Sequence, residues 1–335
     1  MIAVLHLGRC DYATALRLQE SLVELRQQGR IPNVLLFVEH PPVITLGRNA
    51  REANVVASAE FLAERGVEVH EINRGGDVTF HGPGQIVAYP IFDLRSFSRP
   101  STPTTGAPGT PRLGAVSYVR LLEEVLMRIC AHYGVETQRI CGLTGVWTKA
   151  TAPPRLSGRE MRRDYAPTGE DPDLRGSVPD AASLPPTLAA QRRRVEGGAP
   201  GKCGAPGKCG APMGDADWPE RKIAAIGVHI ARGVTSHGFA LNVTTDLEFF
   251  RLIVPCGLAR PVTSIEFETG LRPALDEVVT VASRCFGERF GSQMLWLESI
   301  HDLLREDVAA PDPCDTPARA PENERRAASD DIHLA

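Results

Sequence analysis

The chain has 335 residues, of which 42% are hydrophobic, so it is long enough to bury a substantial core. Its net charge of −4 gives no electrostatic reason to expect nucleic acid or an anionic membrane as a partner. The first residues show no basic segment followed by a long apolar run, and no stretch approaches about 18 apolar residues. We therefore expect neither a signal peptide nor a membrane span, and a cytoplasmic location.

The eight cysteines are scattered without CxxC pairs, which fits a reducing cytoplasm and leaves room for one reactive thiol. Two of them, Cys203 and Cys209, lie in a tandem GAPGKC repeat without histidine or cysteine neighbours at ligand spacing. We expect these two to be exposed, incidental thiols, and we predict no metal site. The other six are Cys10, Cys130, Cys141, Cys256, Cys285 and Cys314.

The first predicted element is a helix over 11–29. Asp11 is placed to cap it, leucines recur at helical spacing, and Gly29 can end it. Two short apolar runs follow, at 34–40 and 43–47, and their length and flanking prolines predict strands.

Residues 85–94 form the next apolar run and predict another strand, in which Pro90 indicates a sheet edge or a bulge. A second helix is predicted over 114–133 from its apolar stripe, and Gly134 can stop it.

Residues 222–243 predict two strands around Arg232 and Gly233, a turn-like pair. A third helix is predicted near 273–289, with Pro273 in its first turn. Because strands and helices mix without regular alternation, we expect an α/β (α+β) fold with a mixed β-sheet flanked by helices.

Three segments are too poor in large apolar residues to offset the entropy of ordering, namely 96–113, about 150–219 and 309–335. We interpret the first two as insertions and the last as a disordered tail. The chain is therefore expected to form one domain over 1–308, interrupted at about 150–219.

Cys256 is the candidate nucleophile. It follows an apolar run between Pro255 and Gly257, in a turn whose backbone N–H groups can face a group bound to the sulfur. The alternative is a small hydrophobic side chain that fills a loop. Lys222 begins a predicted strand and by itself reads as a solvated charge. Beside a cysteine, however, an ammonium lowers the thiol pKa and raises the thiolate fraction.

Three histidines are further candidates. His229 and His237 lie in predicted strands, where structural roles are the default. His81 lies among glycines that let a ligand approach the backbone closely, and a couple between His81 and Cys256 stays open. The glycine-rich stretch 74–85 matches neither GxxxxGK[ST] nor GxGxxG between a strand and a helix. We interpret it as a floor under an extended ligand.

Five motifs occur here in the order found in the bacterial lipoyl(octanoyl) transferases, which the chain resembles over about 1–95, 114–149 and 220–305. They are RGGDVTFHGPGQ from residue 74, GLTGVW (142–147), KIAAIGVHI from residue 222, SHGFALNV (236–243) and IVPCGL (253–258). The segments at 100–113, 152–219 and the tail depart from that pattern.

The resemblance implies the fold of the biotin and lipoate protein ligase catalytic domain, with Cys256 as acyl-thioester nucleophile and Lys222 lowering its pKa and transferring protons. It implies an acyl pocket formed by three segments of the chain. The residues are Arg74, Gly75, Gly76, Asp77, Val78, Thr79, Phe80, His81, Ala225, Ile226, Gly227, Gly238, Phe239 and Ala240.

The implied reaction moves octanoyl from octanoyl-acyl carrier protein to Cys256 and then to a lysine of a lipoyl domain, without ATP or another cofactor. The implied acceptors are the lipoyl domains of 2-oxoacid dehydrogenase complexes and the glycine cleavage H protein. The main alternative is an ATP-dependent lipoate or octanoate protein ligase, which shares the fold. A thiol hydrolase using Cys256 and His81, and a non-enzymatic acyl-binding module, are more distant alternatives.

Overall fold

The computed structural model describes residues 1–97, 113–149, 219–254 and 260–304. These residues belong to one unit, Met1–Ala150 with Pro219–Ala335. Several predictions concern residues outside these ranges. They are the two predicted insertions (residues 98–112 and 150–218), the predicted tail, and the predicted turn at 255–259 with Cys256.

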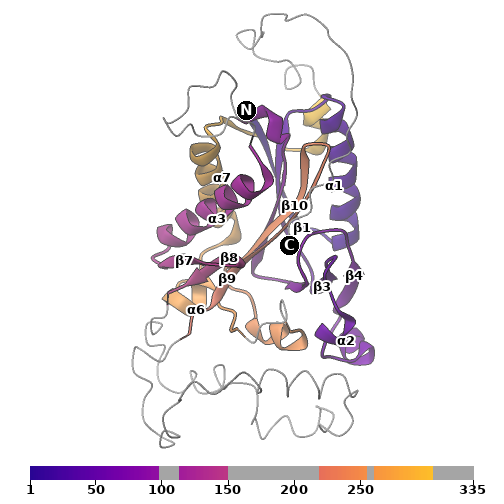
Figure 1. The fold of residues 1–335 in the computed structure, drawn as a ribbon, viewed down its shortest axis with the longest axis vertical. Helices are drawn as coiled ribbons and strands as arrows, with labels where there is room; N and C mark the ends of the chain where they lie inside the picture. Colours follow the sequence, from indigo (N-terminus) through magenta and orange to yellow (C-terminus); the bar gives the residue numbers. More distant parts are fainter. Residues whose placement is uncertain (98–112, 150–218, 255–259, 305–335) are drawn as a thin grey trace, which may run out of the picture. The chain divides into compact units, whose positions relative to one another are not determined.

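An eight-stranded sheet forms the centre of this unit, in the order β11-β1-β2-β6-β10-β9-β8-β7 (Figure 1). Strand β1 pairs in parallel with β2 and β11, and the remaining neighbours are antiparallel. The sheet is therefore mixed, as expected. Its strands are β1 (Ile2–Arg9), β2 (Asn33–Glu39), β6 (Gln85–Ile91), β7 (Thr137–Ile140), β8 (Leu143–Thr148), β9 (Lys222–Ala231), β10 (Val234–Asn242) and β11 (Met294–Trp296).

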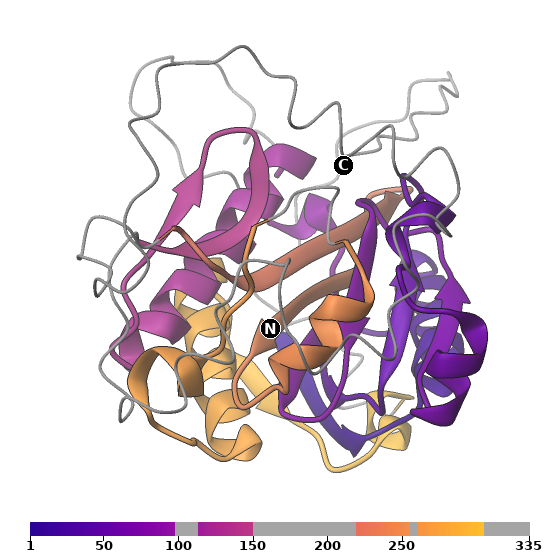
Figure 2. The same ribbon diagram turned by 90° about the horizontal axis from the view of Figure 1, so that it is seen from below.

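Helices cover both faces of this sheet (Figures 1 and 2). Helix α1 (Tyr12–Gln27) packs on one face, where Leu22 joins the inward side chains of β2 and β6. Helices α3 (Ala115–His132) and α7 (Leu275–Phe290) pack on the other face and on each other, around a larger core.

A second, three-stranded sheet lies beside the first, in the order β4-β3-β5. Its apolar side chains pack with those of a short helix, α2, and of a 3-10 helix, η5, in a separate small core. The bounds are β3 (Val43–Leu46), β4 (Glu68–Glu71), β5 (Val78–His81), α2 (Ala59–Glu64) and η5 (Leu247–Leu252). The remaining short helices are η1 (Glu52–Asn54), η2 (Leu94–Ser96), α6 (Ile265–Thr269) and η7 (Ile300–Leu304).

The predicted N-cap of α1 and the predicted turn of the β9–β10 hairpin are confirmed. The Asp11 carboxylate accepts a hydrogen bond of 2.8 Å from the Thr14 amide and caps α1. Arg232 and Gly233 both have positive φ, 52° and 83°, as a two-residue hairpin turn requires.

The expected edge position of Pro90 is wrong, because β6 lies in the interior of the sheet between β2 and β10. The regular ladder to β10 ends at Ala88, and the proline Cδ faces Gly238. Beyond it the Thr235 hydroxyl donates to the Pro90 carbonyl (2.7 Å) and accepts from the Phe92 amide (2.9 Å). A side chain thus supplies the hydrogen bonds that the missing N–H interrupts.

Two further expectations need correction. Helix α7 begins at Leu275 with Ala274 as its N-cap, so Pro273 precedes the helix instead of lying in its first turn. Phe97 and Leu113, which we assigned to a non-core insertion, are 9% and 4% exposed and belong to the larger core. Their aromatic and aliphatic side chains anchor the two ends of that segment.

No helix in the described ranges is long and apolar enough to cross a bilayer.

Candidate active site

The three segments predicted to form the acyl pocket are neighbours in the structure. Within the hairpin, residues 225–227 of β9 pair one to one with residues 238–240 of β10. The glycine-rich turn before β5 meets the same hairpin, because the Gly75 amide donates to the Val228 carbonyl (3.2 Å). Residues 225–227 are only partly buried. The fold therefore brings these segments together around an incompletely covered part of β9.

Arg74 is the most constrained residue of the glycine-rich stretch. Its side chain is buried, and its guanidinium donates to the Thr45 carbonyl (2.8 Å) and to the Thr45 hydroxyl (3.0 Å). A Cβ at Gly227 would lie 3.0 Å from the Arg74 Cδ, and one at Gly47 would lie 2.8 Å from an Arg74 guanidinium nitrogen. Gly227 on β9 and Gly47, which directly follows β3, thus make room for this arginine.

Strand β5 divides its side chains between two environments, as alternation requires. Val78 and Phe80 are buried in the small core, where the Phe80 ring stacks on Phe249 with 4.8 Å between centroids. Thr79 and His81 lie on the opposite face. Upstream, Asp77 accepts hydrogen bonds from the amide of Val78 (2.8 Å) and from the side chain of Asn54 (2.6 Å).

His81 begins a chain of buried side-chain hydrogen bonds. Its Nδ1 lies 2.7 Å from the Gln85 amide oxygen, and Gln85 donates to the Phe80 carbonyl (3.2 Å) and to Asn242 (2.8 Å). Asn242 in turn donates to the Thr263 carbonyl (2.9 Å). Because backbone carbonyls only accept, they fix both amides, and His81 carries its proton on Nδ1. Its Nε2 is therefore a hydrogen-bond acceptor.

Burial lowers the pKa of His81 to about 3, so the ring stays neutral and keeps this acceptor at neutral pH. Gln85 pairs with Asn242 across β6 and β10, and Leu241 pairs with Ala224. Two strand spacings, about 10 Å, therefore separate Gln85 from the start of β9. His81, which contacts Gln85, therefore lies near the end of the hairpin at which Lys222 begins β9.

Lys222 opens β9 and is tied by its backbone to the chain that follows Cys256. Its amide donates to the Pro261 carbonyl and its carbonyl accepts from the Thr263 amide, both at 2.9 Å. Its ammonium lies 5.0 Å from the centroid of the Trp147 ring. The preceding Arg221 is fully buried and forms two hydrogen bonds with Glu268, of 2.7 and 2.8 Å.

The start of β9 is therefore rigidly held from both sides. Cys256 itself lies outside the described residues, so the structure does not place it relative to Lys222 or His81.

Comparison with known proteins decides the family. The family model "Lipoyl protein ligase A/B catalytic domain" matches residues 11–287, which include the hairpin, the glycine-rich stretch and both candidate catalytic residues. The chain belongs to this lipoyl protein ligase A/B family.

Curated members of the family are close in sequence. A protein of Koribacter versatilis (strain Ellin345) named "Octanoyltransferase" is 46% identical over 335 residues, which are 100% of both chains. One of Acidobacterium capsulatum with the same name is 50% identical over 309 residues, 91% of this chain and 97% of that one. The match to the Koribacter protein also spans residues 150–219.

Among solved structures, Plasmodium falciparum LipL1 in complex with lipoate superposes with a TM-score of 0.51 at 9% identity. The match covers 97% of this chain and 76% of that one, and it concerns the fold alone. The expected mixed sheet flanked by helices, of the lipoate protein ligase kind, is confirmed.

A second buried cluster in this lipoyl protein ligase A/B chain was missed from the sequence. The Nδ1 of His40 donates to the Cys10 carbonyl (2.7 Å), so its Nε2 accepts from the Tyr89 hydroxyl (2.7 Å). The His40 and His81 rings lie 6.0 Å apart, and Tyr12 packs against both. Burial lowers the pKa of His40 to about 4. A histidine before two prolines gave no periodic signal that could have identified it.

His237 takes a structural position. Its φ is 55°, its amide donates to Gln19 (3.0 Å), and its Nε2 lies 2.8 Å from the amide oxygen of Asn73. Burial lowers its pKa to about 3. It therefore fastens the residue before Arg74 to β10.

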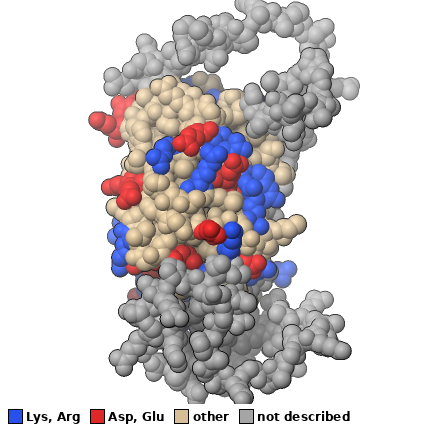
Figure 3. Space-filling model, turned by 90° about the vertical axis from the view of Figure 1, so that its left-hand side faces the viewer, with Lys and Arg blue, Asp and Glu red and all other residues tan. Residues whose placement is uncertain are grey.

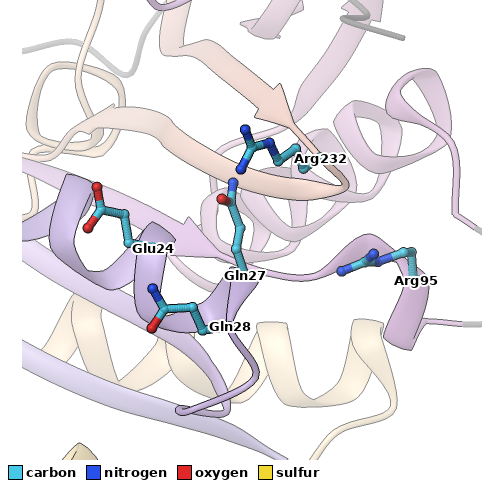
Figure 4. A pocket seen from close by; sticks show the side chains of 5 residues that line it. All are labelled: Glu24, Gln27, Gln28, Arg95 and Arg232. Atoms are coloured by element: carbon cyan, nitrogen blue, oxygen red, sulfur yellow. The ribbon is translucent and has the colours of Figure 1, made fainter. Parts of the chain in front are cut away.

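A polar pocket of about 560 Å³ lies at the other end of the hairpin (Figure 4). Strand β9 spans about 30 Å between Lys222 and this end. Because polar side chains line the pocket, it does not suit an octanoyl tail. The lining residues are Glu24, Gln27, Gln28, Arg95 and Arg232.

The face of the molecule that carries α3 shows basic and acidic side chains intermingled (Figure 3). Ion pairs explain this pattern: Glu124 lies 2.9 Å from Arg289 and 3.4 Å from Arg128. The charges of the described residues on this face are therefore mixed. Among the described residues, no group of three or more His, Cys, Asp or Glu could hold a metal ion.

Proposed function

We propose that this protein transfers octanoyl from octanoyl-acyl carrier protein to a lysine of lipoyl domains through a thioester on Cys256. The observation that carries the proposal is the position of Lys222. It opens the strand that holds predicted acyl-pocket residues, and its backbone is bonded to the segment that follows Cys256. Pro261 follows Cys256 by five residues, so the covalent chain allows at most about 18 Å between these two residues. The name of the curated relatives supports the same reaction.

In the first half-reaction, the Cys256 thiolate attacks the octanoyl thioester carbonyl. The carbon–sulfur bond to the carrier's phosphopantetheine arm breaks, and the carrier leaves as a thiol after taking a proton from the Lys222 ammonium, which becomes a neutral amine. An ordinary thiol, with a pKa of about 8.5, is about 3% ionised at pH 7. A neighbouring ammonium that lowers this pKa by about two units raises the fraction to roughly three quarters. Lys222 is proposed to supply that charge.

In the second half-reaction, the ε-amine of a lipoyl-domain lysine attacks the enzyme thioester. An amide bond forms, the Cys256 sulfur leaves, and Lys222 accepts the proton of the incoming amine. A thioester is already activated toward an amine, so this route consumes no ATP.

The octanoyl tail is proposed to lie along the pocket formed by segments 74–81, 225–227 and 238–240. Seven carbons beyond the carbonyl contribute about 5–6 kcal/mol at about 0.8 kcal/mol per buried methylene. The neutral ring of His81 offers an acceptor to a polar N–H of the substrate near this pocket. The expected acceptors are the lipoyl domains of 2-oxoacid dehydrogenase complexes and the glycine cleavage H protein, in a reducing cytoplasm.

Intact-mass measurement tests the first half-reaction. After mixing with octanoyl carrier protein, the full chain is expected to gain one octanoyl group at Cys256. The Cys256→Ser variant should gain none, whereas Cys141→Ser, which removes an exposed cysteine, should react like the wild type. Octanoyl found on another cysteine, or no adduct with the wild type, contradicts the proposal.

The ATP-dependent ligase remains the alternative, because the family model covers both ligase types. It predicts that Cys256→Ser still modifies a lipoyl domain when given ATP and free octanoate. The transferase predicts that this variant is inactive with either octanoyl donor.

A further inference from the structure

Two cationic side chains contact the ring of Trp147. The Lys222 ammonium lies 5.0 Å from the ring centroid, and the Arg260 guanidinium carbon lies 5.6 Å from it. The tryptophan is 2% exposed, whereas Lys222 and Arg260 are partly exposed. Its ring therefore gathers positive charge at the site of the proposed catalytic lysine.

The strands fix this arrangement. Trp147 of β8 stands opposite Lys222 of β9, directly after a register shift at Val146. Gly145, with φ of 118°, lies beneath the lysine stem, because a Cβ there would be 3.0 Å from the Lys222 Cε. The lysine stem thus crosses a position without a side chain, and its ammonium ends over the indole.

A ring face attracts an ammonium without supplying a counter-charge. The aromatic quadrupole attracts such a cation electrostatically, most strongly for tryptophan. A carboxylate in the same place would neutralise the field that a thiolate needs. The ring forms no conventional hydrogen bond with the ammonium, so the contact is electrostatic.

Arg260 adds a mechanical link. It is the first described residue after Cys256, and it is also paired with Glu220 at 3.3 Å. Its contact with the indole therefore joins the start of the described segment 260–304 to Trp147. The Trp147 N–H has no hydrogen-bond partner among the described residues, so packing holds the ring.

We propose that Trp147 is a positioning residue, whose ring holds the Lys222 ammonium where it lowers the pKa of the Cys256 thiol. The proposal rests on the proposed function, in which Cys256 is the nucleophile. It assigns no contact between Trp147 and substrate.

The test measures how fast iodoacetamide alkylates Cys256 in the full-length protein between pH 5 and pH 10, with the modified peptide quantified by mass spectrometry. Trp147→Leu keeps an apolar side chain but removes the ring, and it should slow alkylation at pH 7 by about threefold to tenfold. At pH 10, where the thiol is ionised in every variant, the rates should converge. Trp147→Phe keeps an aromatic face and should restore most of the rate.

Trp296→Leu is the matched control, because Trp296 is 47% exposed on β11 at the far edge of the sheet. It should follow the wild-type profile. The inference is overturned if Trp147→Leu keeps that profile, or if it loses the same factor at every pH, which indicates structural damage. An ordinary thiol profile for the wild-type Cys256 instead contradicts the proposed function itself, so the two failures are distinguishable.

Discussion

The carboxylate of Glu268 holds the guanidinium of Arg221 through two hydrogen bonds of 2.7 and 2.8 Å, in a position where Arg221 is fully buried. Glu268 also accepts a hydrogen bond from the Thr263 hydroxyl. The pair thus anchors the residue before Lys222 to the segment that follows Cys256. A bidentate pair that satisfies several donors at once tolerates burial, but neither partner tolerates loss of the other.

Replacing Glu268 should therefore be costly. Glu268→Gln leaves the Arg221 charge buried without its counter-charge, and the free energy of unfolding should fall by about 3–5 kcal/mol in urea titrations. The control is Glu136→Gln, which breaks the exposed ion pair with Lys149 and should cost less than about 1 kcal/mol. Equal losses for the two variants would refute this account.

The proton of His81 should depend on Gln85. Wild-type ¹H–¹⁵N spectra of the histidine rings should show His81 protonated on Nδ1. Gln85→Leu removes the acceptor and leaves buried polar groups unpaired, each at a cost of about 1–3 kcal/mol. The Nδ1 signal should then shift or broaden. Gln138→Leu, at the β7 edge, should leave the His81 Nδ1 signal unchanged. A wild-type His81 ring protonated on Nε2 would contradict the assignment.

Stability should fall as the pH drops below the ordinary histidine range. Burial lowers the pKa values of His40, His81 and His237 from 6.5 to about 4, 3 and 3. Between pH 6.5 and 4 the unfolded chain binds protons that the folded chain refuses, so acid favours unfolding. The stabilisation is fully present above pH 6.5 and is lost as the pH falls toward the folded pKa values.

Each such histidine contributes up to about 1.4 kcal/mol per pH unit to this slope. His40→Gln should reduce the slope of the free energy of unfolding against pH, measured by urea titrations between pH 6.5 and 5, by up to about 1.4 kcal/mol per pH unit. His132→Gln removes an exposed ring and serves as the control. An unchanged slope in His40→Gln contradicts the prediction.

Gly238 should not tolerate a side chain. A Cβ there would collide with the Ala88 carbonyl and lie 2.6 Å from the Pro90 Cδ. Gly238→Ala should lower the free energy of unfolding by about 1–3 kcal/mol or more, because neither neighbour can move without shifting a strand. Gly114→Ala places its Cβ in open space at a helix N-cap and should cost at most about 1 kcal/mol. Similar midpoints for both variants would show that the strands yield.

The sequence predicted those features whose causes are local. Asp11 capping a helix, the Arg232–Gly233 turn and the strands on either side of it depend on neighbouring residues, and the structure has them. The pairing of 225–227 with 238–240 follows from that turn, because a two-residue hairpin fixes the register. The resemblance to a known family supplied Lys222 as a site residue, which its position at a strand start did not.

The sequence could not predict what depends on distant partners. Gln85 reaches Asn242 across 157 residues, and nothing near either position marks the other as its hydrogen-bond partner. The prediction for Phe97 and Leu113 was wrong for a similar reason. It rested on the composition of the whole segment 96–113, whereas their burial depends on contacts with distant parts of the chain. Trp147 stands over Lys222 only because a register shift in β8 turns it there.

Pro90 also has a consequence for how this protein can change. The proline ring fills the space beside Gly238, and loss of the Thr235 hydroxyl would leave the Pro90 carbonyl and the Phe92 amide without this hydrogen-bond partner. Positions 90 and 235, separated by 145 residues, are therefore coupled to each other and to Gly238. Substitutions here should be epistatic: each is harmful alone, and a tolerated route passes through paired replacements.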